Sequence, residues 1–292
     1  MTNTIDTSRL ARPSGIRTIA LGDLEITYLP DGAGGLKPRG WFADSTAEDW
    51  AANPHHLDAD GMLVASFGAL LVAQGNRALL VDAGLGPLEA PGPPGDPVFG
   101  PLRGGALLDS LAEVGRSPSD IEAIAVTHLH PDHIGWAAKV DDDGRPVFDC
   151  PVVLGEQEWT ERAPNEPYGP FQEQFDALEP RVRTVVPGEE VFPGVEAVAS
   201  VGHTPGHLSY RITSGGHTLI VIGDAMHSPL QIGRPEWSAA PDSDPTEAVR
   251  SRRELIESLR EPNTLGFGVH FADVVFGRVV DGEAGPVWQP LP

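Results

Sequence analysis

Four residues with metal-binding side chains follow one apolar segment within six positions. The segment IEAIAVTH is mostly apolar, as in a buried strand, and it runs directly into the loop THLHPDHIG. Because side chains alternate along a strand, His128 and His130 point to the same side. The turn at Pro131 then redirects Asp132 and His133 to an adjacent point. This arrangement suits two neighbouring metal ions better than one, so the fold must present the end of a buried strand to a metal centre.

The single cysteine restricts the kind of metal centre. Cys150 is the only cysteine in 292 residues, so a Cys zinc cage, a CxxC redox pair and an intramolecular disulfide are all excluded. Imidazole and carboxylate groups are the ligands expected for Zn²⁺ and for Mn²⁺, Fe²⁺ or Co²⁺. Two divalent metal ions, zinc by default, are therefore the predicted cofactors.

The charge balance restricts the partners. The chain carries 20 basic and 42 acidic side chains, a formal net charge of −22, which repels nucleic acid and anionic membrane surfaces. The sequence contains no signal-peptide pattern and no stretch near the roughly 18 apolar residues of a membrane span. We therefore expect a cytoplasmic protein that acts on a neutral or modestly charged small molecule.

Strand and turn signals alternate in the first half of the chain. RTIALG and LEITYL predict one hairpin, and LVASFGALLVAQG and RALLVDAG predict a second one around Gly75 and Asn76 that ends at Asp82. Residues 31–60 are interpreted as an ordered loop with a helical turn. The Pro- and Gly-rich residues 84–105 are interpreted as a surface loop.

The second half repeats this alternation. RVRTVV, VEAVASVG, LSYRIT and HTLIVIGD carry strand signals, and a helix is predicted over 245–259. Strands with interposed helices in both halves predict an α/β fold in which two sheets pack together with helices outside. We expect one domain over residues 1–292, with an N-terminal arm at 1–16 and a pocket cap of short helices at 154–178.

Further candidate ligands stand at later strand ends. His203 follows VEAVASV and lies between Gly202 and Gly206, which permit a close approach of the backbone. The strand HTLIVIGD similarly presents Asp224 at its C-terminal end. Rigid scaffolds usually carry their sites on loops beyond strand ends, so both residues are candidates for the metal centre.

Taken together, these motifs resemble those of the metallo-β-lactamase superfamily, in the order found there. VDAG at 81–84, THLHPDHIG, GHTPGH at 202–207, GDAMH at 223–227 and a terminal His270 carry the resemblance over most of the chain. It implies a four-layer αββα sandwich with two packed mixed sheets. It also implies seven metal ligands: His128, His130 and His203 for the first ion, Asp132, His133 and His270 for the second, and Asp224 as the bridge.

The resemblance also implies a reaction. A hydroxide bridging the two metal ions would attack a carbonyl or phosphoryl group, and Asp132 or Asp224 would help to move protons. GDAMHSPLQ, DSDP and HFADVVFG are similar to the branch that contains methyl parathion hydrolase and related lactonases. That branch implies hydrolysis of a lactone or ester, promiscuous phosphotriesterase activity and a homodimer. Many signal lactonases have a tyrosine shortly after the bridging aspartate, whereas this chain has His227, a third candidate catalytic residue that could donate to an oxyanion.

Two other functions stay open. A glyoxalase II-like thioesterase shares the metal motif but recognises an anionic glutathione group, for which Lys37 and Lys139 form no obvious basic cluster. A catalytically silent metal-binding protein is the alternative from another class. The complete set of ligands argues against it.

The other singled-out residues have no assigned role in the reaction. Asp82 and His207 either support metal ligands through hydrogen bonds or have a structural role in a turn. His55, His56 and His217 are interpreted as surface residues. Five aromatic residues form either an apolar cap or core: Trp136, Trp159, Tyr168, Phe171 and Phe175.

Overall fold

The first of two sheets contains most of the N-terminal half of the chain. The structure, a computed structural model, describes residues 6–164 and 168–292. Among these, nine strands form a sheet in the order β5-β6-β2-β3-β4-β7-β8-β9, with β1 paired to β2. The strands from β4 to β9 in this order run parallel, and the other pairs are antiparallel. The strands are β1 (Arg17–Leu21), β2 (Leu24–Leu36), β3 (Leu63–Gln74), β4 (Arg77–Val81), β5 (Glu89–Ala90), β6 (Phe99–Arg103), β7 (Ala123–Ala125), β8 (Val152–Gly155) and β9 (Val182–Val185).

The second sheet contains the C-terminal strands in sequence order. It is antiparallel except between β13 and β14, which run parallel and are joined through a long helix. It is therefore mixed like the first sheet. The strands are β10 (Glu190–Phe192), β11 (Val195–Ala199), β12 (Leu208–Ser214), β13 (His217–Val221), β14 (Thr264–Phe267), β15 (Phe276–Gly282) and β16 (Gly285–Pro290).

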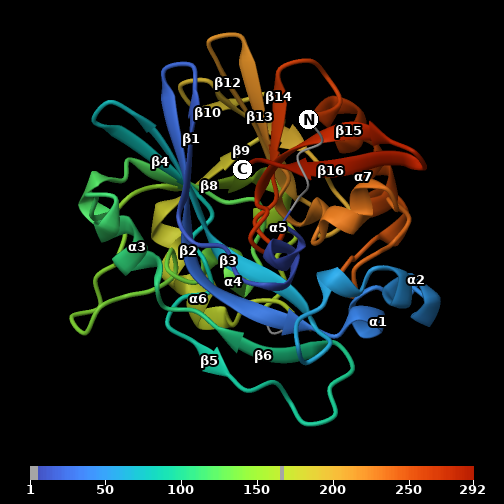
Figure 1. Ribbon diagram of the computed structural model, residues 1–292. Coiled ribbons are helices and arrows are strands. Elements are labelled where there is room, and N and C mark those ends of the chain that lie inside the picture. Colours follow the sequence, from blue (N-terminus) through green and yellow to red (C-terminus); the bar gives the residue numbers. More distant parts are fainter. Residues whose placement is uncertain (1–5, 165–167) are drawn as a thin grey trace.

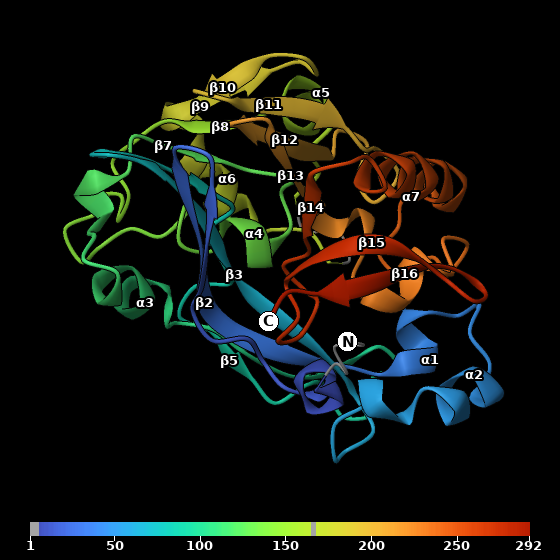
Figure 2. The same ribbon diagram turned by 45° about the horizontal axis from the view of Figure 1, so that its top comes forward.

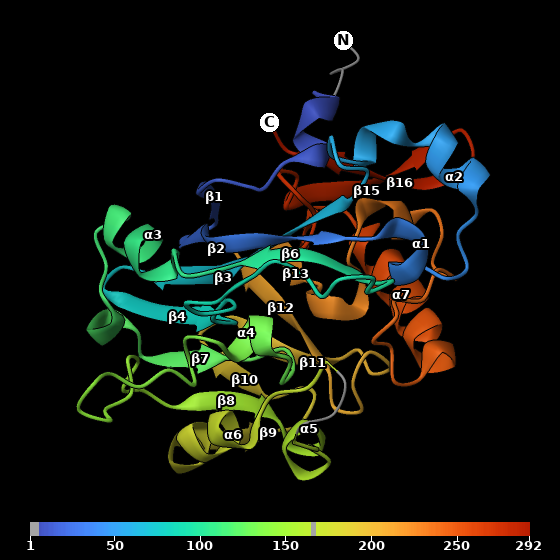
Figure 3. The ribbon, with the colours of Figure 1, turned by 90° about the horizontal axis from the view of Figure 1, so that it is seen from below.

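Helices cover the outer faces of both sheets. Figures 1 and 3 show α3 and α7 at opposite sides of the molecule, and Figure 2 shows α7 beside the C-terminal strands. The predicted architecture, two packed mixed sheets with helices outside, is confirmed. The α-helices are α1 (Pro38–Trp41), α2 (Ala47–Ala52), α3 (Leu107–Glu113), α4 (Pro131–Ile134), α5 (Glu156–Thr160), α6 (Gln172–Leu178) and α7 (Pro245–Leu259). None of these helices is long and apolar enough to cross a membrane.

The central strands are apolar on both faces because both faces are buried. On β3, Leu70 and Val72 belong to the core between the two sheets, whereas Ala69 and Leu71 belong to the core beneath the outer helices. This alternation follows from the two-residue period of a strand. A continuous apolar run such as LVASFGALLVAQ is therefore what a strand in the middle of four layers requires.

Two loop predictions were wrong in part. Strand β2 continues to Leu36 instead of ending before residue 31, and residues 99–103 of the predicted surface loop form β6, which pairs with β2. Glycine makes this pairing close, because a Cβ at Gly32 would lie 1.9 Å from the carbonyl oxygen of Arg103. Gly-rich sequence here marks packed strands and not an irregular loop.

A buried aspartate connects β2 to three other segments. The β2–β3 register shifts between Pro30 and Gly32, and Asp31 lies at this irregularity. Its carboxylate accepts five hydrogen bonds of 2.8–3.0 Å, from the backbone N–H groups of Leu85, Gly86, Gly105 and Leu107 and from Trp136 Nε1. Asp31 thus holds the loops after β4 and β6 against the sheet.

We expect Asp31→Ala to lower the free energy of unfolding by at least about 3 kcal/mol, because it leaves several buried N–H donors without an acceptor. Urea unfolding of the purified protein measures the change. Asp142→Ala, in an exposed turn, is the control and should change stability by less than about 0.5 kcal/mol. Equal stability of the two variants would contradict the role of Asp31.

His56 is buried, so its interpretation as a surface residue was wrong. It ends a short 3₁₀ helix, Pro54–His56, and its ring lies 4.7 Å from that of the exposed His55. Burial, followed by the neighbouring charges of His55 and Arg234, lowers the pKa of His56 from 6.5 to about 3. The folded protein therefore holds this imidazole neutral.

The neutral state of His56 in the folded protein makes the free energy of unfolding depend on pH. Between about pH 6.5 and pH 3 the unfolded chain binds a proton on His56 that the folded chain does not bind. The free energy of unfolding should therefore fall as the pH falls. His56 contributes at most about 1.4 kcal/mol to this decrease per pH unit. Unfolding of His56→Gln at pH 7 and pH 5 should show a smaller loss than the wild type. His217→Gln, at an exposed histidine, should follow the wild type.

Candidate metal centre

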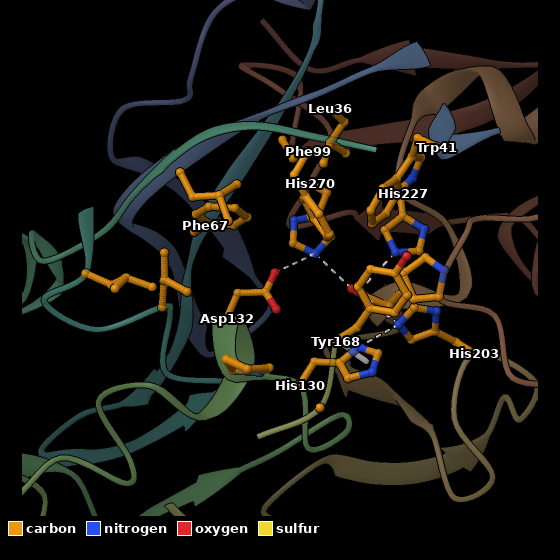
Figure 4. A pocket seen from close by; sticks show the side chains of 18 of the residues that line it. Leu36, Trp41, Phe67, Phe99, His130, Asp132, Tyr168, His203, His227 and His270 are labelled. Atoms are coloured by element: carbon orange, nitrogen blue, oxygen red, sulfur yellow. Dashed lines mark hydrogen bonds and ion pairs between the residues drawn. The ribbon is translucent and has the colours of Figure 1, made fainter. Parts of the chain in front are cut away.

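Strand ends from both sheets bring the predicted ligands to one place. His128 and His130 lie in the loop after β7, and Asp132 and His133 lie in the short helix α4 that follows it. The later ligands follow strands of the second sheet: His203 follows β11, Asp224 lies in the turn after β13, and His270 follows β14. Figure 4 shows His130, Asp132, His203, His227 and His270 around one space.

The two oxygens of Asp224 face different histidines. Oδ2 lies 3.3 Å from His203 Nε2 and 3.7 Å from His128 Nε2. Oδ1 lies 2.9 Å from His270 Nε2 and 3.1 Å from His133 Nε2. The candidate ligands thus fall into two groups, one of His128, His130 and His203 with Asp224, the other of Asp132, His133 and His270, in which His133 and His270 approach the second oxygen of Asp224.

Unpartnered buried atoms show that these residues fit metal ions. Nε2 of His128, Nε2 of His133 and Oδ1 of Asp224 are buried and make no hydrogen bond of good geometry in the described part of the chain, although Oδ1 lies 2.9 Å from His270 Nε2. In addition, His203 Nε2 and His130 Nδ1 lie only 3.0 Å apart. Buried polar atoms normally find a partner. Divalent cations would satisfy all of these nitrogen and oxygen atoms at once, and imidazole and carboxylate are suitable donors for them.

The electrostatics favour the metal-binding forms of His128, His130 and Asp224. For His133 and His270, by contrast, burial is outweighed by the carboxylate of Asp224, which raises their pKa values. Burial, followed by the neighbouring histidines, lowers the pKa values of His128 and His130 well below the usual range. Although burial opposes its ionisation, the surrounding histidines, His133 foremost, hold the pKa of Asp224 well below its usual range. A neutral imidazole and an ionised carboxylate are the forms that bind metals.

Hydrogen bonds from Asp82 and His207 support two of the candidate ligands, His133 and Asp224. Asp82 Oδ2 lies 2.9 Å from His133 Nδ1, and its Oδ1 accepts the backbone N–H of Thr127. His207 supports the centre differently, because its Nε2 accepts the backbone N–H of Asp224 at 2.9 Å. Asp82 also has a φ of +60°, a left-handed backbone conformation in the loop that follows β4.

Two supporting carboxylates were missed in the sequence. Asp242 Oδ1 lies 2.9 Å from His203 Nδ1, and its Oδ2 pairs at 3.1 Å with the fully buried Arg252. Glu158 accepts hydrogen bonds from Leu129 N, Thr204 Oγ1 and Gly206 N. It thereby joins the two loops that carry His128 and His203. The DSDP segment contains Asp242, but no local pattern indicates these long-range partners.

An apolar cavity of about 320 Å³ adjoins the centre. No Lys or Arg is among the described residues that line it. Apart from Tyr168, its titratable lining groups are two carboxylates and four histidines: Asp132, Asp224, His130, His203, His227 and His270. His227 Nε2 lies 3.0 Å from Asp224 Oδ2, and its ring packs against Trp41. The apolar lining residues include Leu36, Trp41, Ala65, Phe67, Leu85, Leu88, Phe99, Leu102, Tyr168 and Phe171.

The predicted cap contributes to this cavity only in part. Tyr168 and Phe171 line it, and Phe171 is 63% exposed at its mouth. Trp136 and Phe175 are buried in the core, and Trp159 packs against Phe175. Residues 165–167 of the predicted cap lie outside the described residues. His55 and His217 are not among the residues that line the cavity.

The chain is similar to known proteins in both sequence and structure. The sequence model of the metallo-beta-lactamase superfamily matches residues 69–264. An N-acyl homoserine lactonase from Bacillus sp. is 30% identical over 184 residues, which cover 61% of this chain and 64% of the lactonase, less than two thirds of its length.

Two solved structures are similar over most of the chain. The dizinc quorum-quenching lactonase AidC, in complex with a product, has a TM-score of 0.80 at 25% identity and covers 96% of this chain and 98% of its own. The hydrolase AbOPH has a TM-score of 0.76 at 23% identity, with 96% and 99% covered.

We expect Asp82→Asn to lower metal affinity by roughly 10- to 100-fold, because it weakens the hydrogen bond that orients His133. Asn tolerates the left-handed backbone of this position. Competition with a chromogenic zinc chelator measures the change, and Asp142→Asn is the matched control. Unchanged affinity in Asp82→Asn would show that this hydrogen bond does not tune the centre.

Proposed function

The chain belongs to the metallo-beta-lactamase superfamily, and from this premise we propose that it is a dinuclear metal-dependent hydrolase of neutral lactones or esters with an apolar acyl group. One observation carries the proposal. Six potential metal ligands surround Asp224, itself the seventh, at the end of an apolar cavity that has no Lys or Arg among its described lining residues.

The ligands divide between two ions in this proposal. His128, His130 and His203 would hold the first ion, Asp132, His133 and His270 the second, and Asp224 would contact both. Bound divalent ions, zinc by default, supply a water activated near neutral pH and polarise the carbonyl oxygen of the substrate.

Three side chains at the cavity would act on the substrate. Asp132 lines the cavity, and its side chain is 24% exposed, so it can exchange protons with a bound molecule. The ionised Asp224 accepts hydrogen bonds and orients the attacking group. His227 lines the cavity wall beside Asp224 and would donate a hydrogen bond to the oxygen on which charge develops.

The cavity lining supports a neutral substrate. Among the described residues, ten apolar or aromatic side chains other than proline line it, and exposed Leu88, Tyr168 and Phe171 extend the apolar surface at its mouth. An acyl chain would bury apolar area there, worth about 0.8 kcal/mol per methylene. Phosphotriesters are also uncharged, which supports promiscuous activity on them. The anionic group of a glutathione thioester would find no Lys or Arg among the described lining residues.

The deciding experiment combines metal analysis with a substrate panel. Elemental analysis of the purified protein should give near two metal ions per chain. Turnover should be highest on an N-acyl lactone, lower on a phosphotriester and lowest on an anionic glutathione thioester. Chelation or His128→Ala should lower turnover at least roughly 100-fold, because the activated water is lost. His217→Ala, at an exposed histidine, should be as active as the wild type.

Each other outcome has its own meaning. A chain that binds metal but turns over none of these substrates would support the silent metal-binding alternative. Fastest turnover of the thioester would support the glyoxalase II-like alternative. Absence of both metal and turnover after reconstitution with zinc would overturn the hydrolase proposal.

A further inference from the structure

Three arginines near the N-terminal end of the described chain, two in the arm and one at the start of β1, lie close to one aspartate. Arg9, Arg12 and Arg17 all approach Asp273, which is only 2% exposed. The distances from Arg12 Nη2 and Arg17 Nη2 to its carboxylate oxygens are 2.9 and 2.6 Å. The side chain of Arg9 donates to the backbone carbonyl oxygen of Asp273, and the backbone N–H of Asp273 donates to the backbone carbonyl oxygen of Arg9. Three of only 20 basic side chains in the protein thus converge on a single residue.

Asp273 lies in the short loop that carries His270. Within this loop Ala272 has a φ of +47°, a conformation that costs free energy for any residue with a Cβ. Such a conformation persists only where surrounding contacts impose it. The loop therefore depends on contacts from outside its own sequence.

Ser66 on β3 transmits these contacts to His270. Its carbonyl oxygen lies 2.9 Å from His270 Nδ1, and its Oγ donates to the carbonyl oxygen of Ala272 at 3.0 Å. The same Oγ accepts the backbone N–H of Ser14 from the arm at 3.0 Å. The arm thus contacts both the strained end of the loop and the residue that orients the imidazole.

We propose that residues 6–17 form a strap that positions His270 at the metal centre, with Asp273, Arg12 and Arg17 as positioning residues. The proposal rests on the proposed function in so far as His270 is a ligand of the second ion. The strap itself does not line the cavity. The strap should tune one of the two ion sites, because the ligands of the first set lie on other loops.

The test uses the full chain with Asp273→Asn and, separately, the double variant Arg12→Gln/Arg17→Gln. Each protein is loaded with zinc and titrated with a competing chelator, and zinc per chain is measured. We expect one of the two ions to be lost at a chelator concentration roughly 10-fold lower than in the wild type, while the other ion is retained. Arg77→Gln, which breaks an exposed ion pair with Glu122, is the control and should behave like the wild type.

A rescue variant separates positioning from general stability. Glycine adopts the φ of residue 272 without strain, so Ala272→Gly added to Asp273→Asn should restore much of the lost affinity. Added to His270→Ala it should restore none, because the ligand itself is missing. Wild-type affinity at both ion sites in the strap variants would overturn the proposal, as would equal weakening of both.

Amide hydrogen exchange tests the role of the strap independently of the proposed function. Both strap variants should exchange faster at residues 268–275 than the wild type, and Arg77→Gln should not. A wild-type chain that binds no zinc would overturn the proposed function, and exchange would then decide the strap alone. Unchanged exchange in this loop would overturn it.

Discussion

One buried carboxylate organises the centre of this molecule. Asp224 lies among five histidine Nε2 atoms at 2.9–3.7 Å, three facing its Oδ2 and two facing its Oδ1. Burying so many polar groups is unfavourable unless each has a partner. Divalent ions would supply partners for the atoms that lack one, and the fold brings these atoms together by ending strands of both sheets at the same place. The four layers can therefore be understood as the support that keeps these strand ends together.

Other buried carboxylates fix the loops around that centre. Asp82 orients His133, Asp242 orients His203, and Glu158 joins the two loops in which His128 and His203 lie. Asp31 holds the loops that form the cavity wall. Acidic residues in this chain thus act inside the molecule as acceptors for backbone and imidazole N–H groups, in addition to charging its surface.

The sequence predicts features whose signals are local. The histidine motif, the hairpin around Gly75 and the helix at 245–259 could be predicted because apolar periodicity and turn residues lie within one short segment. The pairing of β6 with β2, the burial of His56 and the role of Glu158 could not, because each depends on residues far away in the sequence. Glu158, for instance, accepts from Leu129, 29 positions away, and from Gly206, 48 positions away.

The absence of Lys and Arg from the described lining of the cavity also bears on the end of the proposed reaction. Opening a neutral lactone ring creates a carboxylate, so the product carries a charge that the substrate lacks. In a chain of net charge −22, a cavity lined by apolar groups offers this anion little to bind once it leaves the metal ions. The surface that admits the neutral substrate would then hold the charged product only weakly, which favours its release into water.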